Sequence, residues 1–200
     1  GAGWAYKFDN GFAVSSNFVS SKTDLLTNEG ATSWANQVGY TQNQWSASVM
    51  VNAKYNGWHD EYFHSTGDAP ASGGSNFTAV GLRTWWRPLE TGTMVPSVSL
   101  GYDTTSYDDT APETSDQSSS WFAGLTWQDA FQADDRIGLA FGQPTVNEAE
   151  TLDPFAFEMY YSFKVNDSVT MTPAYFSNTN RAGTSGDDVS GIILETTLKF

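Results

Sequence analysis

Residues 155–165 read FAFEMYYSFKV, and residues 192–200 read IILETTLKF. In both segments large apolar residues recur at every second position and alternate with small, polar or charged residues. This is the two-residue period of a β-strand with one apolar face. Residues 169–175, which follow the turn at 166–168, repeat the pattern. A soluble sandwich also alternates, but aromatic residues at this density opposite charged ones are more typical of a barrel wall that faces lipid.

Composition limits the classes of protein that fit the chain. Its 200 residues suffice for one domain, and its net charge of −14 argues against nucleic-acid binding, which needs a basic surface. The absence of cysteine removes disulfide bonds and thiolate metal sites. No run of about eighteen apolar residues is present, which argues against a membrane-spanning helix. A low mean hydropathy is compatible with spanning strands, because each has one polar face.

The rest of the chain reads as strand pairs, and about eleven strands are predicted in total. Short turns near Asn10, Asn43, Gly92, Asp134 and Asp167 alternate with longer polar loops, of which 56–75 is the longest. Prolines 88, 96, 154 and 173 are expected near strand ends, where a missing backbone donor costs least. The predicted strands are 3–8, 12–18, 34–40, 45–55, 76–88, 94–106, 119–128, 136–142, 155–165, 169–175 and 192–200.

Four segments in the last third of the chain carry a family resemblance. They are GLAFGQP (138–144), the aromatic strand 155–165, NDSVTMTP (166–173) and ETTLKF (195–200). Together they resemble the carboxyl-terminal part of the carbohydrate-selective (OprB-type) outer-membrane porins, particularly those of cyanobacteria. The resemblance implies a transmembrane antiparallel β-barrel of about sixteen strands in the bacterial outer membrane, assembled as a homotrimer. It also implies passive diffusion of small solutes.

Phe200 resembles the terminal aromatic residue of outer-membrane barrels in general. In those proteins the C-terminal strand, with its alternating apolar residues, acts as an insertion signal. The resemblance therefore implies that the last strand of this chain is recognised by the barrel-assembly machinery.

Loop lengths predict an orientation. In outer-membrane barrels the short turns lie in the periplasm and the long loops lie outside, which places Phe200 in the periplasm. Single-chain barrels of this kind have an even number of strands and both chain ends in the periplasm. Residues 1–200 are therefore predicted to be the C-terminal portion of one larger barrel domain, with an odd number of strands before Gly1.

Most of the nine basic residues fall on the strand face opposite the apolar one, whereas acidic residues concentrate in loops. A basic lumen would favour anions or hydrogen-bond sugar hydroxyls. Alternatively, the inward charges brace the wall by pairing with acidic residues on the same face, Glu158 or Glu195. The candidate pore-lining residues are Lys7, Lys54, Arg83, Arg87, Arg136, Glu158, Lys164, Glu195 and Lys199.

Other functional constellations are weaker. His59 and His64 flank two acidic residues, but their spacing fits no standard ligand pair, so a solvated loop is the favoured interpretation. Glu158 and Glu195 could be read as a glycosidase pair, since two carboxylates are what that chemistry needs. Any acidic chain offers such pairs, however, so neither a catalytic residue nor a cofactor or metal is predicted.

Two functions from different classes remain. The first is an outer-membrane porin that forms a water-filled channel for sugars, inorganic ions or both, with membrane lipid as its surroundings. The alternative is a secreted, soluble β-sandwich that binds or hydrolyses glycans through exposed aromatic residues. A barrel that serves as an adhesin or phage receptor through its loops would be compatible with transport.

Overall fold

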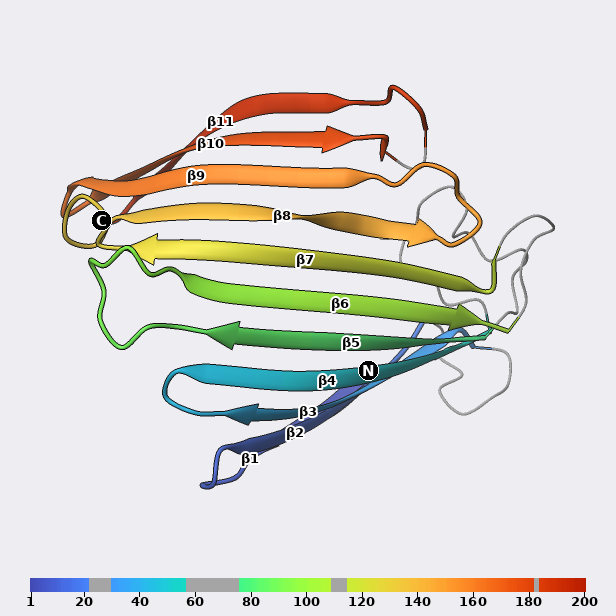
Figure 1. Cartoon of the computed structure of the whole chain (residues 1–200). Coiled ribbons are helices and arrows are strands. Elements are labelled where there is room, and N and C mark those ends of the chain that lie inside the picture. Colours follow the sequence, from blue (N-terminus) through green and yellow to red (C-terminus); the bar gives the residue numbers. More distant parts are fainter. Residues whose placement is uncertain (22–29, 57–75, 109–114, 182–183) are drawn as a thin grey trace.

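The computed structural model describes residues 1–21, 30–56, 76–108, 115–181 and 184–200. These residues form a single antiparallel sheet in which each strand pairs with the next along the chain (Figure 1). The described part of the chain contains no helix long and apolar enough to cross a membrane. The eleven strands are β1 (Ala2–Lys7), β2 (Phe12–Ser20), β3 (Thr32–Thr41), β4 (Trp45–Tyr55), β5 (Phe77–Trp86), β6 (Ser97–Tyr107), β7 (Gln117–Gln128), β8 (Arg136–Asn147), β9 (Phe155–Asn166), β10 (Val169–Thr179) and β11 (Val189–Leu198).

The sheet has two different ends. The connections β1–β2, β3–β4, β5–β6, β7–β8 and β9–β10 lie at one end, here called the turn end, and the other connections lie at the loop end. At the first of these turns, Gly11 has a φ of +95°, as the sequence 9–11 predicts for a tight turn. The number and order of the predicted strands are thus confirmed, but the predicted alternation of short and long connections is interrupted at β5–β6, because residues 87–96 form a longer connection than 148–154 or 180–188 at the loop end.

Strand register assigns every side chain to one of two faces, because residues that pair directly across strands lie on the same side of the sheet. The predicted separation of apolar from polar residues is confirmed. The apolar face includes Trp4, Tyr6, Phe12, Trp34, Val38, Trp45, Val49, Leu82, Trp86, Leu100, Tyr102, Trp121, Leu125, Leu139, Met159, Tyr175 and Leu194. The polar face includes Ser15, Gln37, Ser48, Asn52, Gly81, Arg83, Gly101, Asp103, Ser120, Phe122, Gly138, Ala140, Glu158, Tyr160, Ala174 and Glu195.

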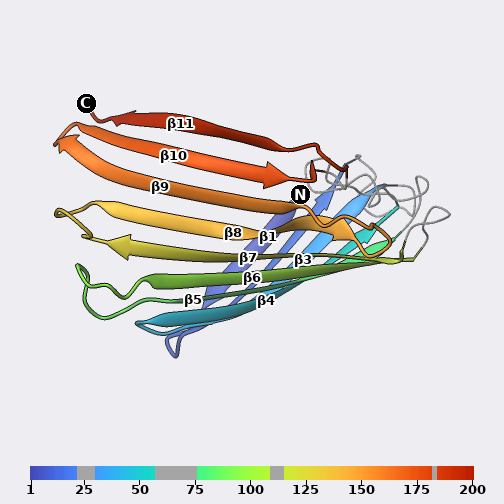
Figure 2. The ribbon, with the colours of Figure 1, turned by 45° about the horizontal axis from the view of Figure 1, so that its top comes forward.

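The sheet is a single curved layer (Figure 2). Among the described residues, the buried apolar side chains are Phe77, Tyr107 and Val146, all near the loop end. Asn147 ties that end of β8 to the start of β7, because its amide donates hydrogen bonds to the carbonyls of Ser115 and Gln117 at 2.8 and 3.2 Å. The hydrophobic core is therefore small and peripheral, and large apolar residues remain uncovered along the strands.

Several predicted boundaries were wrong. β8 continues through Pro144 to Asn147, so the loop predicted from residue 144 begins later, because the Asn147 hydrogen bonds hold this segment against β7. The connection between β5 and β6 is longer than predicted and spans residues 87–96. It contains Pro88 and Pro96, both near strand ends as expected, and Pro154 likewise directly precedes β9.

Pro173 corrects the fourth proline prediction, because it lies inside β10 rather than near a strand end. It pairs with Leu194 of β11, whereas its backbone pairing with β9 is interrupted at residues 172–173, although the register is the same on either side. A proline has no N–H to donate to the ladder. The hydroxyl of Thr172 hydrogen-bonds that of Ser162 on β9 at 2.9 Å, so a side-chain contact joins the two strands where the backbone pairing is interrupted.

Candidate pore-lining face

The nine candidate residues lie along the polar face and just beyond two of its strands. Arg87 directly follows β5 and Lys199 directly follows β11. The others are assigned to the polar face by register: Lys7, Lys54, Arg83, Arg136, Glu158, Lys164 and Glu195. The structure therefore brings the candidates to one side of the sheet but spreads them from the turn end to the loop end.

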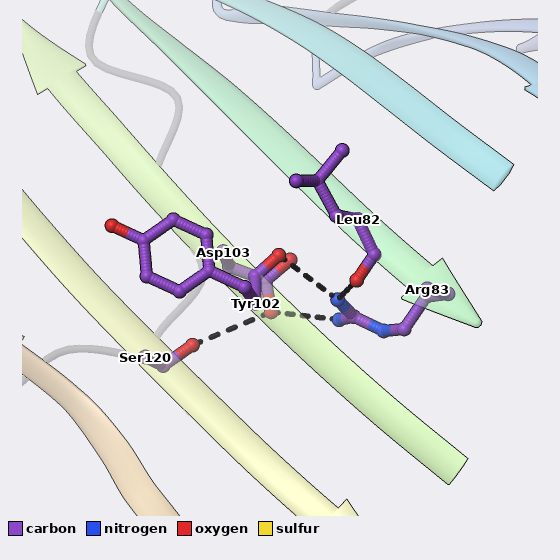
Figure 3. A network of polar contacts seen from close by, with 5 residues as sticks. All are labelled: Leu82, Arg83, Tyr102, Asp103 and Ser120. Carbon is purple, nitrogen blue, oxygen red and sulfur yellow. Dashed lines mark hydrogen bonds and ion pairs between the residues drawn. The ribbon is translucent and has the colours of Figure 1, made fainter. Parts of the chain in front are cut away.

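Arg83 is the centre of a polar network on this face (Figure 3). One of its terminal nitrogens, Nη2, lies 2.7 Å from Oδ2 of Asp103 on the neighbouring strand β6, and Nη1 donates to the carbonyl of Leu82 at 2.8 Å. Ser120 of β7 donates its hydroxyl to the same Asp103 oxygen at 3.3 Å. The network therefore spans three strands and fixes the guanidinium group close to the sheet.

Asp103 alters the predicted electrostatics of the polar face. The sequence analysis suggested Glu158 or Glu195 as partners for inward cations, but Arg83 pairs with Asp103 and Lys164 pairs with Asp134 at 2.6 Å. Asp103 was missed, although its signal was present: it is an acidic residue at a polar-face position of the alternating segment 97–107. Because its charge is matched, Arg83 adds less positive charge to the polar face than the sequence suggests.

Two aromatic rings lie flat on the polar face against glycines of the adjacent strands. Phe122 is the direct partner of Gly101, and Tyr160 is the direct partner of Gly138. A Cβ atom added to either glycine would collide with the ring opposite, so each ring uses the space that a side chain would fill. The guanidinium carbon of Arg83 lies 5.4 Å from the Phe122 ring centroid, which links one ring to the Arg83 network.

The turn end carries cations that have no acidic partner. Within the described part of the chain, no ion pair joins Lys7, Arg87, Arg136 or Lys199 to an acidic residue. Lys164 is the exception at this end, since it pairs with Asp134 in the β7–β8 turn. The hydrogen bond and charge of Lys164 lower the pKa of the Asp134 carboxyl below its ordinary value.

Asp135 organises the β7–β8 turn and was not identified from the sequence. Its carboxylate is fully buried and accepts hydrogen bonds from the backbone N–H groups of residues 130–132 and from the Tyr161 hydroxyl. Burial by itself would raise the pKa of this carboxyl, but the hydrogen bonds from Tyr161 and the backbone outweigh burial and lower the pKa. In the sequence, Asp135 directly precedes a predicted strand and looks like any other aspartate in a turn.

The remaining candidates lie apart from these groups. Lys54 is nearly buried at the loop end, where its ammonium group lies 5.0 Å from the ring centroid of Phe77. Along β10, Glu158 is opposite Phe176 and Glu195 is opposite Thr172. This offset of four residues separates the two glutamate backbone positions by about 13 Å along the strand, so the register does not place them opposite each other.

The histidine pair considered in the sequence, His59 and His64, lies outside the described residues. Phe200 lies beyond the end of β11 and is fully exposed, while the N–H of Lys199 still donates to the carbonyl of Ser168 at 2.8 Å. No family model, no curated protein and no solved structure matches this chain.

Proposed function

We propose that this chain forms part of the wall of an outer-membrane porin, a water-filled channel for passive diffusion of small hydrophilic solutes such as sugars and inorganic ions. In this proposal the apolar face contacts membrane lipid and the polar face lines the channel. The turn end lies in the periplasm and the loop end lies outside. The observation that carries the proposal is the exposure of the apolar face on a sheet with one layer.

That exposure is extensive. Trp4, Leu82 and Leu194, from three separate parts of the sheet, have exposed fractions of 59%, 47% and 58%. A water-soluble domain of this length buries most of its apolar side chains in a core, and soluble monomers rarely expose a large continuous apolar patch. Hydrocarbon is the environment in which such a face is stable, provided that the backbone groups are paired within the sheet.

The distribution of aromatic residues gives further support. On several strands the apolar face carries an aromatic residue toward each end and an aliphatic residue between them, which matches the two aromatic girdles and central apolar band of outer-membrane barrels. The series are Phe12, Val14 and Phe18 on β2; Tyr40, Val38 and Trp34 on β3; and Trp45, Val49 and Tyr55 on β4.

The free edges of the sheet support the larger-barrel part of the proposal. β1 and β11 do not pair with each other within the described structure, and they lie on opposite sides of the sheet in Figure 1. A sheet edge with unpaired backbone groups is not stable in hydrocarbon, so in this proposal further strands complete the wall. We propose a barrel of about sixteen strands that forms homotrimers, with exposed Phe200 as the signal for the barrel-assembly machinery.

The glycan-binding sandwich has less support. A sandwich buries the inner faces of two sheets against each other, with a core about 10 Å thick. The described residues form one sheet, and the side of it that would have to be buried is instead its exposed face. Solubility without detergent remains the simplest observation that would favour this alternative.

The experiment that tests the proposal is a conductance measurement in planar bilayers. The full-length, detergent-extracted protein is compared with Arg83→Ala, Asp103→Asn and the double variant. We expect stable conductance steps in all four proteins. Because each single variant leaves one charge of the pair unmatched, Arg83→Ala should shift the reversal potential toward cation preference and Asp103→Asn toward anion preference. The double variant should return close to the parent value.

Arg181→Gln serves as the control, since Arg181 pairs with Asp187 in the last loop at 3.4 Å and lies away from the polar face of the strands. It should leave the reversal potential nearly unchanged. A folded protein that conducts no current would contradict the porin proposal. If the protein conducts but neither Arg83→Ala nor Asp103→Asn changes the reversal potential, the two side chains are not exposed to the channel.

A further inference from the structure

A cavity of about 630 Å³ lies at the turn end of the sheet, lined by residues of the β1–β2 turn, the β3–β4 turn and the end of β5. Figures 1 and 2 show these two turns beside each other at the same end of the molecule. Register places Lys7 on the polar face at the end of β1 and Trp85 on the same face near the end of β5. The cavity therefore opens on the polar side of the sheet.

Arg87 is held in position within this cavity. Its Nε donates to the carbonyl of Asn43 at 2.9 Å, and its guanidinium carbon lies 5.5 Å from the centroid of a Trp85 ring. Its backbone N–H also donates to the carbonyl of Gln44 at 2.8 Å. These contacts orient the guanidinium group without neutralising it, which leaves its terminal nitrogens as donors for an oxyanion.

Lys7 supplies a second cation to the same cavity. Across the described residues, neither Lys7 nor Arg87 forms an ion pair, although the Asp9 carboxylate also lines the cavity. Lys7, Arg87 and Asp9 together give the cavity one net positive charge, in a protein whose overall charge is −14. A local excess of cations in a strongly acidic chain favours an anionic ligand at this place.

The volume and lining identify the ligand class further. The cavity is open to solvent, and its volume of about 630 Å³ leaves room for a small organic ligand as well as for an inorganic oxyanion. The indole of Trp85 and the polar groups of Asp9 and Asn43 suit a ring that carries hydroxyl groups. We propose that this cavity binds small phosphorylated solutes of the sugar-phosphate type, with Arg87 and Lys7 on the phosphate group.

This inference deepens the proposed function, and its role at a channel mouth rests on that function. In the porin orientation the cavity would form a binding site at the periplasmic mouth. A lipid phosphate shares the same chemistry, but lipid headgroups adjoin the apolar face, whereas Lys7 and Trp85 belong to the polar face. The structure therefore favours a soluble phosphate ester over a lipid.

The test is a calorimetric titration of the folded full-length protein in a phosphate-free detergent at low ionic strength, where charge effects are least screened. The probes are glucose 6-phosphate, inorganic phosphate and glucose, and the variants are Arg87→Ala, Lys7→Ala and the control Arg181→Gln. We expect glucose 6-phosphate to bind more tightly than the other two probes. Arg87→Ala and Lys7→Ala should each weaken its binding about tenfold or more, as expected for loss of a charge-assisted hydrogen bond.

Arg181→Gln removes one positive charge at the loop end and should leave the affinity unchanged. Absence of binding, equal effects of all three variants, or equal affinity for glucose and glucose 6-phosphate would each overturn the proposal. A repeat in phosphatidylcholine vesicles separates the two phosphate sources, because loss of binding only there would assign the cavity to lipid. Conductance without glucose 6-phosphate binding would refute this site and leave the porin proposal standing.

Discussion

At the scale of single residues, the closest fit in the sheet is between Gly138 and the ring of Tyr160. We expect Gly138→Val to destabilise the folded protein by about 1–3 kcal/mol, because its side chain would occupy the place of the ring. The midpoint of urea unfolding from lipid vesicles measures this effect. Gly124→Ala is the matched control, since the nearest atom to its added Cβ, in Ser99, is 3.8 Å away.

The same pair provides a rescue experiment. Truncation of the ring in Gly138→Val/Tyr160→Ala removes the collision, so the double variant should be less destabilised than the sum of the two single variants. If the two effects simply add, the ring does not lie against Gly138 as described.

Residue-scale contacts show the limit of what the sequence predicts. The polar-face position of Arg83 follows from alternation, because a period of two determines the face. Its pairing with Asp103 depends on strand register, which the turn lengths alone did not fix, since the β5–β6 connection is longer than predicted. The contact between Arg87 and Asn43 joins residues far apart in sequence and follows from the register of β4 and β5, in which Trp45 pairs with Trp86.

At the scale of elements, the β7–β8 turn depends on one carboxylate. Asp135→Asn retains the size of the side chain but removes the charge that accepts hydrogen bonds from residues 130–132 and Tyr161. We expect a lower urea midpoint at neutral pH than in the parent. Asp167→Asn, in the exposed β9–β10 turn, is the control and should have little effect.

The pH dependence of that stability has a definite sign. The pKa of Asp135 is lowered in the folded state relative to the model-peptide value of 3.8, so the folded protein favours the ionised form. The stabilisation by Asp135 is therefore complete above about pH 4 and is lost as the pH falls through the folded-state pKa. The difference between the parent and Asp135→Asn should shrink below pH 4, and a difference that grows on acidification would contradict this assignment.

Element boundaries were predicted well where turn residues are distinctive and poorly where a side chain extends a strand. The β7–β8 turn was located from its run of polar residues, whereas β8 was ended too early at Gly142. Pro144 suggested a loop, yet Asn147, three residues later, holds that segment against β7. Such a hydrogen bond between distant residues has no local signal in the sequence.

At the scale of the whole molecule, the proposed function requires that the apolar face be buried in lipid. Leu139 and Ala140 are consecutive in β8 and lie on opposite faces: Leu139 pairs with Leu125 and Met159, whereas Ala140 pairs with Gly124 and Glu158. Substitutions at these two positions therefore probe the two faces of the sheet at the same point along the strand. Lysine at either position adds the same charge to the same strand.

We expect Leu139→Lys to destabilise the protein in bilayers, lowering its free energy of unfolding by about 2–4 kcal/mol, the cost of a lysine at the lipid-facing midplane of a barrel. Ala140→Lys should fold nearly as well as the parent, because its charge enters the aqueous side beside Glu158. Urea titration of protein folded in lipid vesicles measures both variants. Equal tolerance of the two lysines, together with folding of the parent in water without detergent, would show that neither face contacts lipid and would favour the soluble alternative.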